Sequence, residues 1–111
     1  MQFQWDNGNT RHLIIEYPER GNTTSEIESL FADPCFDALP DRVDNRGEQQ
    51  YHALGRSNQN RLLYVIFSIR NGQIRPISCR PVSRKERDRY AQICEQQGAE
   101  TPAPEDLGDT E

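Results

Sequence analysis

The chain has 111 residues, a formal net charge of -5 and 33% hydrophobic residues, so we expect one domain with a small core. The N-terminal segment MQFQWDNG lacks the apolar stretch of a signal peptide, and the longest apolar run, residues 62–69, is too short to cross a bilayer. We therefore expect a soluble, cytoplasmic protein that does not bind a membrane. The spacing of Cys35, Cys79 and Cys94 fits no metal site or CxxC motif, and we expect all three to be reduced.

Positive charge is concentrated in one part of the chain. Residues 56–90 hold nine basic side chains against two acidic ones, a net charge of +7, whereas residues 1–55 hold four basic and ten acidic side chains. We call the nine the arginine strip: Arg56, Arg61, Arg70, Arg75, Arg80, Arg84, Lys85, Arg87 and Arg89. Planar guanidinium groups match phosphate oxygens, so the strip suggests an anionic ligand. The alternative is a solvated face whose arginines pair with the acidic flanks.

The first quarter of the chain predicts a short strand and two helices. Residues 2–5 alternate between polar and apolar side chains, which favours a strand. Asp6 can cap a helix over residues 7–16, which ends before Pro18. Thr23 and Glu26 form a capping-box pattern, in which each side chain bonds the backbone of the other. That pattern starts a short helix with one apolar stripe of Ile27, Leu30 and Phe31.

Four strands follow, predicted over residues 36–43, 51–56, 61–70 and 73–80. The first is a weak edge strand, and the third is apolar on both faces, as a central strand is. Asn71-Gly72 favours a two-residue type I′ turn, and Pro76 marks an edge or a bulge. Without a bulge, the turn places Arg80 opposite Leu63. A bulge swaps the faces, so the pairing alone leaves open which arginines converge.

The chain ends in a helix and an acidic segment. Ser83 and Glu86 can form a capping box at the start of a helix over residues 84–97. Residues 98–111 contain five acids, two prolines and one large apolar residue, so we expect a disordered acidic tail after a folded domain of residues 1–97. The predicted order is β-α-α-β-β-β-β-α, an α+β fold with helices packed on an antiparallel sheet of four to five strands.

The arginines provide the strongest candidate for a functional site. The chain has no phosphate loop, metal-ligand cluster or nucleophile motif, and we expect no cofactor and no metal. His12 and His52 are both isolated, and an isolated His is more often structural than catalytic. The strands and the start of the last helix bring six basic residues into one region, beside Tyr64, where they can bind phosphate and stabilise charge developing at phosphorus: Arg56, Arg70, Arg75, Arg80, Arg84 and Lys85.

The ordered series of motifs over residues 2–92 resembles the BrnT family of bacterial toxins, the toxin half of a type II toxin–antitoxin pair. The matching segments are FQWDNGNTRHL, EIESLFADP and YHALGRSNQNRLLYVIFSIRNGQIRPISCRPVSRKERDRY. The resemblance implies a RelE-like ribonuclease fold and RNA cleavage that blocks translation, without a metal. It also implies neutralisation by a BrnA-like antitoxin with a ribbon-helix-helix DNA-binding domain.

Within that resemblance, Arg56, Arg70 and Arg80 fall on basic positions of the active site and His12 falls on the His of the N-terminal motif. We expect these four to be catalytic: the arginines hold the scissile phosphate, and His12, or alternatively Tyr64, assists proton transfer. Four more residues are expected to bind substrate: Tyr64, Arg75, Arg84 and Lys85. Phe67 stands where many family members have a His. This departure favours a rival hypothesis, a non-catalytic module that binds an acidic partner or nucleic acid through the arginine strip.

Overall fold

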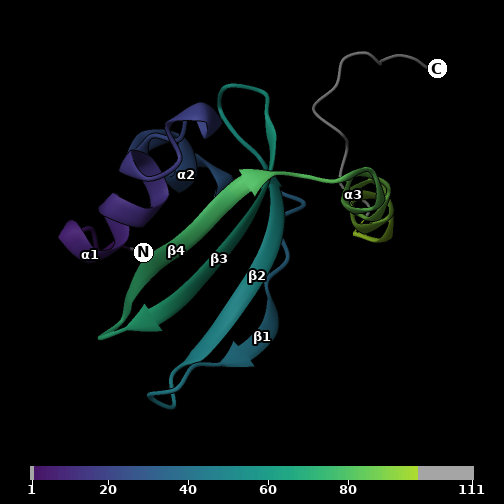
Figure 1. Ribbon diagram of the computed structural model, residues 1–111. Coiled ribbons are helices and arrows are strands. Elements are labelled where there is room, and N and C mark those ends of the chain that lie inside the picture. Colours follow the sequence, from purple (N-terminus) through teal and green to yellow (C-terminus); the bar gives the residue numbers. More distant parts are fainter. Residues whose placement is uncertain (1, 98–111) are drawn as a thin grey trace.

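The computed structural model describes residues 2–97 and shows an α+β fold, as expected (Figure 1). Four antiparallel strands form one sheet in the order β1-β2-β3-β4. The predicted tail over residues 98–111 lies outside the described residues. The elements are α1 (Asn7–Thr10), the π-helix η1 (Arg11–Ile15), the 3-10 helix η2 (Pro18–Arg20), α2 (Thr24–Leu30), β1 (Leu39–Val43), β2 (Gln49–Arg56), β3 (Leu62–Arg70), β4 (Gln73–Pro81) and α3 (Arg84–Gln96).

The N-terminal segment runs along β4 and then forms the first helical layer. The expected first strand is reduced to a single parallel bridge between Phe3 and Ile74. Asp6 caps α1 as predicted, since its side chain accepts from the backbone N–H groups of Gly8 and Asn9. The helix continues as the π-helical turn η1, which buries Leu13 in the core.

The predicted capping box at the start of α2 is only half present. The Thr23 hydroxyl accepts from the Glu26 backbone N–H at 3.1 Å, as expected. The Glu26 carboxylate does not complete the box, because it accepts instead from Arg61 at 2.8 and 2.7 Å and from the Ser57 hydroxyl at 2.6 Å. The Glu26 carboxylate therefore bonds Arg61, 35 residues away in sequence, in place of the nearby Thr23 backbone N–H. This contact connects α2 to the turn between β2 and β3.

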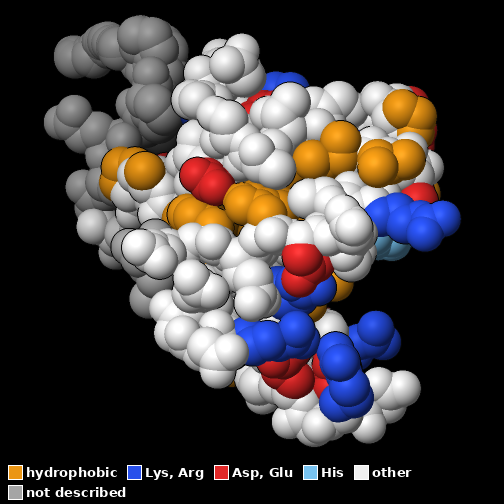
Figure 2. Space-filling view, turned by 90° about the vertical axis from the view of Figure 1, so that its left-hand side faces the viewer, with side chains coloured by type: hydrophobic (Ala, Val, Ile, Leu, Met, Phe, Trp, Pro, Cys, Tyr) orange, Lys and Arg blue, Asp and Glu red, His pale blue; other side chains and the backbone are white. Residues whose placement is uncertain are grey.

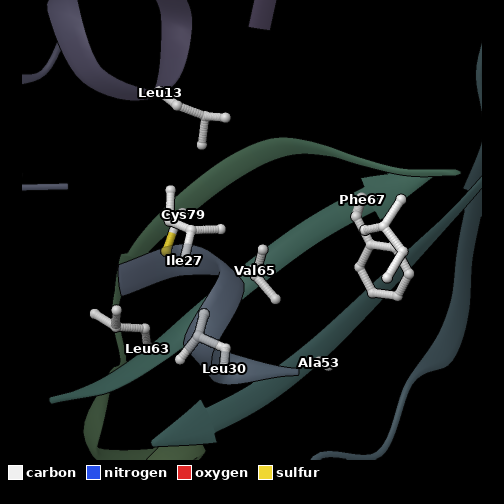
Figure 3. Packing of buried hydrophobic residues seen from close by; sticks show 9 residues of the cluster. Leu13, Ile27, Leu30, Ala53, Leu63, Val65, Phe67 and Cys79 are labelled. Atoms are coloured by element: carbon white, nitrogen blue, oxygen red, sulfur yellow. The ribbon is translucent and has the colours of Figure 1, made fainter. Parts of the chain in front are cut away.

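The main core lies between the sheet and the N-terminal helices. Leu13 and Leu30 from the helices meet Val65 of β3 and Cys79 of β4, and each of these four side chains is at most 1% exposed. Figure 3 shows these side chains pointing toward one another across the layer. Close packing of this kind fixes which face of each strand is buried and so leaves the opposite face for other contacts.

The last helix packs on the opposite face of the sheet and covers only one end of it. Tyr90 and Cys94 of α3 form a second, smaller cluster with Leu54 of β2 and Leu62 of β3. Ser83 and Glu86 form the predicted capping box. The expectation that all three cysteines are reduced is wrong, because Cys35 and Cys94 form a disulfide across 59 residues of sequence while Cys79 is free and buried. The bridge ties α3 to the segment that follows α2.

Candidate functional site

The part of the second sheet face that α3 does not cover carries a set of polar side chains beside one isoleucine. We call it the open face. The register places its side chains in rows across β2, β3 and β4, and they are Gln50, His52, Tyr64, Ile66, Ser68, Arg70, Arg75, Ser78 and Arg80. Three of the arginines of the strip are therefore on one surface. Gln50 and Ser68 are buried beneath their neighbours, at 8% and 0% exposed.

A β-bulge in β4 creates this arrangement. Ser68 pairs with Arg75 and Phe67 with Pro76, but Ile66 then pairs with Ser78, so that Ile77 is the extra residue. Beyond the bulge, Arg80 lies opposite Tyr64 instead of Leu63, the partner expected without a bulge. Side chains alternate between faces along a strand, so one inserted residue moves Arg80 from the core side to the open face.

Arg70 and Arg75 border a hollow at one end of the open face. Arg70 donates two hydrogen bonds to Glu48 at 3.1 and 2.9 Å, and Arg75 donates two to Asp6 at 2.6 and 3.1 Å. These contacts lower the pKa of Glu48 and bring that of Asp6 to about 2. The hollow has a volume of about 180 Å³, and His12 also lines it. Figure 2 shows basic and acidic side chains interleaved around a hollow on this side of the molecule.

Arg80 and Tyr64 form the second cluster of the open face. Arg80 donates to both carboxylate oxygens of Glu86 on α3 at 2.9 Å, and this pairing lowers the pKa of Glu86 to about 2. The guanidinium carbon of Arg80 lies 4.2 Å from the ring centre of Tyr64, a cation–π contact. Burial raises the pKa of Tyr64, so its hydroxyl stays protonated at neutral pH. The Arg80 side chain remains 37% exposed and accessible to a ligand.

Residues 5–86 match the family described as the ribonuclease toxin, BrnT, of type II toxin–antitoxin systems. The chain belongs to the BrnT family. Comparison with curated proteins finds no match. The matched segment contains every strand of the sheet and every residue of the open face, so the family and the site describe the same part of the chain.

The structure brings together only some of the residues expected to form the BrnT site. Arg70, Arg75 and His12 line one hollow, and Arg80 contacts Tyr64, as described above. Arg56 lies instead at the end of β2, where its backbone N–H donates to Asp33 at 2.7 Å. Its guanidinium carbon is 5.6 Å from the ring centre of Tyr90 on α3.

Arg84 and Lys85 are exposed in the first turn of α3. The alternative interpretation of the arginine strip, pairing with the acidic flanks, holds for three of its members, and a fourth, Arg80, pairs with an acidic residue inside the same stretch of the chain. Arg61 pairs with Glu26, Arg70 with Glu48, Arg75 with Asp6 and Arg80 with Glu86. Clustered arginines in this BrnT family member are therefore partly neutralised within the chain, and the positive charge of the strip does not by itself require an external anion.

His52, which the sequence indicates to be isolated and more often structural than catalytic, belongs to the open face. Its Nδ1 atom lies 3.1 Å from Oδ1 of Asp41, and its ring stacks on Tyr64 with centres 5.9 Å apart and an angle of 15°. Asp41 lies on the neighbouring strand β1, eleven residues away in sequence. The pair matches no short motif, so the only available signal was the expected pairing of two adjacent strands.

Between residues 2 and 97, no group of three or more His, Cys, Asp or Glu side chains is arranged to hold a metal ion. Over the same residues, no helix is long and apolar enough to cross a membrane.

Proposed function

We propose that this BrnT family member cleaves RNA at the open face of its sheet, blocks translation in this way, and is neutralised by a BrnA-like ribbon-helix-helix antitoxin. The family match supports ribonuclease activity and an antitoxin partner. The observation that carries the choice of site is the bulge at Ile77, because it places Arg80 on the same face as Arg70 and Arg75. RNA and ribosomes are cytoplasmic, and the proposed location of the protein is therefore the cytoplasm.

The arginines of the open face are suited to binding a phosphodiester. Guanidinium groups donate two parallel hydrogen bonds to phosphate as they do to carboxylate. Each of these arginines is already held by a carboxylate from another part of the chain, which fixes its orientation before substrate arrives. Arg80 is more exposed than Arg70 or Arg75, at 37% against 31% and 14%. We assign Arg80 to the scissile phosphate and Arg70 and Arg75 to flanking phosphates. Positive charge held beside phosphorus stabilises the additional negative charge of the transition state.

The test is cleavage of a labelled RNA transcript by purified protein in the presence of EDTA. We expect cleavage by the wild type and a loss of about 10²–10³ in kcat for Arg80→Ala, the usual cost of removing one group that stabilises transition-state charge. Arg11→Ala is the matched control, because Arg11 has a side chain that is 75% exposed and lies outside the open face. RNA binding without cleavage would instead support the non-catalytic module, and cleavage that requires a divalent metal would contradict the metal-independent mechanism.

A further inference from the structure

The tautomer of the neutral His52 ring follows from its partner on the neighbouring strand. Nδ1 of His52 lies 3.1 Å from an oxygen of Asp41. A carboxylate oxygen only accepts hydrogen bonds, so Nδ1 carries the proton of the neutral ring and Nε2 keeps its lone pair. Hydrolases that use a His to remove a hydroxyl proton orient it through the same contact between Nδ1 and a carboxylate. His52 is therefore arranged to accept a proton on Nε2.

The surroundings of His52 place a cation and a stacking surface beside it. The ring of His52 and the guanidinium carbon of Arg80 lie 5.9 and 4.2 Å, respectively, from the ring centre of Tyr64. The side chains of His52 and Arg80 are 20% and 37% exposed, so both are partly open to solvent. A base and a phosphate-binding group that both contact one aromatic ring can contact the ribose and the phosphate of a single nucleotide unit.

The other histidine is held less firmly. Nδ1 of His12 lies 3.2 Å from Glu16, but the two side chains are 42% and 48% exposed, against 20% and 27% for His52 and Asp41. Exposed pairs of this kind are screened by water and restrict the orientation of their members weakly. Both rings contact a tyrosine, His12 edge-on to Tyr17 at 5.3 Å between centres and His52 stacked on Tyr64 at 5.9 Å, so the difference between them is the burial of their carboxylate contacts.

We propose that His52 is a catalytic residue that takes the proton of the attacking ribose 2′-hydroxyl on Nε2, with Asp41 as its positioning residue. The assignment rests on the proposed function. As the proton moves to Nε2, the 2′-oxygen forms a bond to phosphorus and the bond from phosphorus to the 5′-oxygen breaks. The 5′-oxygen leaves with the electron pair and takes a proton from water, and the resulting hydroxide removes the proton from Nε2. The products are a 2′,3′-cyclic phosphate and a 5′-hydroxyl.

The experiment compares wild-type protein with His52→Ala, His12→Ala and Asp41→Asn on a 5′-labelled RNA transcript. We expect His52→Ala to lower kcat by about 10²–10⁴, the usual contribution of a general base, with little change in KM. Added imidazole should restore part of this loss, which a purely structural role would not allow. Asp41→Asn should lower kcat by a smaller factor, and exposed Gln92→Ala on α3 serves as the control for unchanged activity.

Four results overturn the assignment. Wild-type cleavage rates in His52→Ala would remove His52 from the mechanism. Loss of cleavage confined to His12→Ala would give the role to His12. Loss in His52→Ala without imidazole rescue, together with a lower urea midpoint, would make His52 a structural residue. A wild-type protein that leaves the transcript intact would overturn the proposed function and the assignment together, whereas the first three results leave the proposed function standing.

Discussion

The buried carboxylate of Glu26 makes a quantitative prediction about stability. Its side chain is 6% exposed and accepts two hydrogen bonds from Arg61 and one from Ser57. The Arg61 contact lowers the pKa of Glu26, so the group is ionised in the folded protein at neutral pH. Glu26→Ala removes all three acceptor contacts and leaves a guanidinium and a hydroxyl without their partner. Breaking a buried ion pair on one side costs about 3–5 kcal/mol.

For Glu26→Ala the lower end of the 3–5 kcal/mol range applies, because the Arg61 side chain is 34% exposed to water and still donates to the Arg20 carbonyl at 2.9 Å. We therefore expect a loss of about 3 kcal/mol. With an m value of about 1.5 kcal/mol per molar, this lowers the urea midpoint by about 2 M. Equilibrium unfolding in urea measures it, with exposed Glu19→Ala as a control that shifts stability by less than about 0.5 kcal/mol. A midpoint for Glu26→Ala equal to that of the control would refute the role of this contact.

Three further predictions concern other contacts of the fold. Cys94→Ser should lower the free energy of unfolding by about 4 kcal/mol, because the Cys35–Cys94 bridge closes a loop of about 60 residues. Urea unfolding of the wild type and the variant, each with and without reductant, measures this loss. Equal urea midpoints for the oxidised wild type and the variant would contradict it. Gly55→Ala should lower the free energy of unfolding by about 1–3 kcal/mol, since the added methyl group would lie 3.1 Å from a ring carbon of Phe36. An unchanged melting temperature would count against this prediction. The pKa of Glu86 is lowered from 4.5 to about 2, chiefly by Arg80, so the stability from this pair is present above pH 4.5 and is lost as the pH falls toward 2. Glu86→Gln should flatten the loss of stability in that acid range, and an unchanged slope would show that the pair contributes nothing.

Local patterns predicted the parts of the fold that depend on neighbouring residues. Asn71 and Gly72 adopt φ angles of 54° and 75°, as a type I′ turn requires, and Ser83 with Glu86 forms the expected capping box. Pro76 indicated an edge or a bulge, and it lies next to a bulge on an edge strand. These features follow from backbone geometry within a few residues.

Contacts between distant residues could not be predicted in the same way. The capping pattern at Glu26 was overridden by Arg61, which lies 35 residues further along the chain. The disulfide joins cysteines whose spacing matches no motif, since only the packing of α3 brings them together. The sheet face on which Arg80 lies depends on whether β4 contains a bulge before it. Pairing shifted by one residue would have placed Arg80 and Arg70 on opposite faces of the sheet.

The most direct test of RNA cleavage at the open face is inducible expression in a bacterium of the wild type beside the Arg70→Ala/Arg80→Ala double variant. Growth and the integrity of total RNA are scored, and soluble, folded protein is verified for both. We expect growth arrest with RNA cleavage for the wild type and loss of both effects in the double variant. Equal arrest and cleavage by the two proteins would contradict the assignment of RNA cleavage to the arginines of the open face.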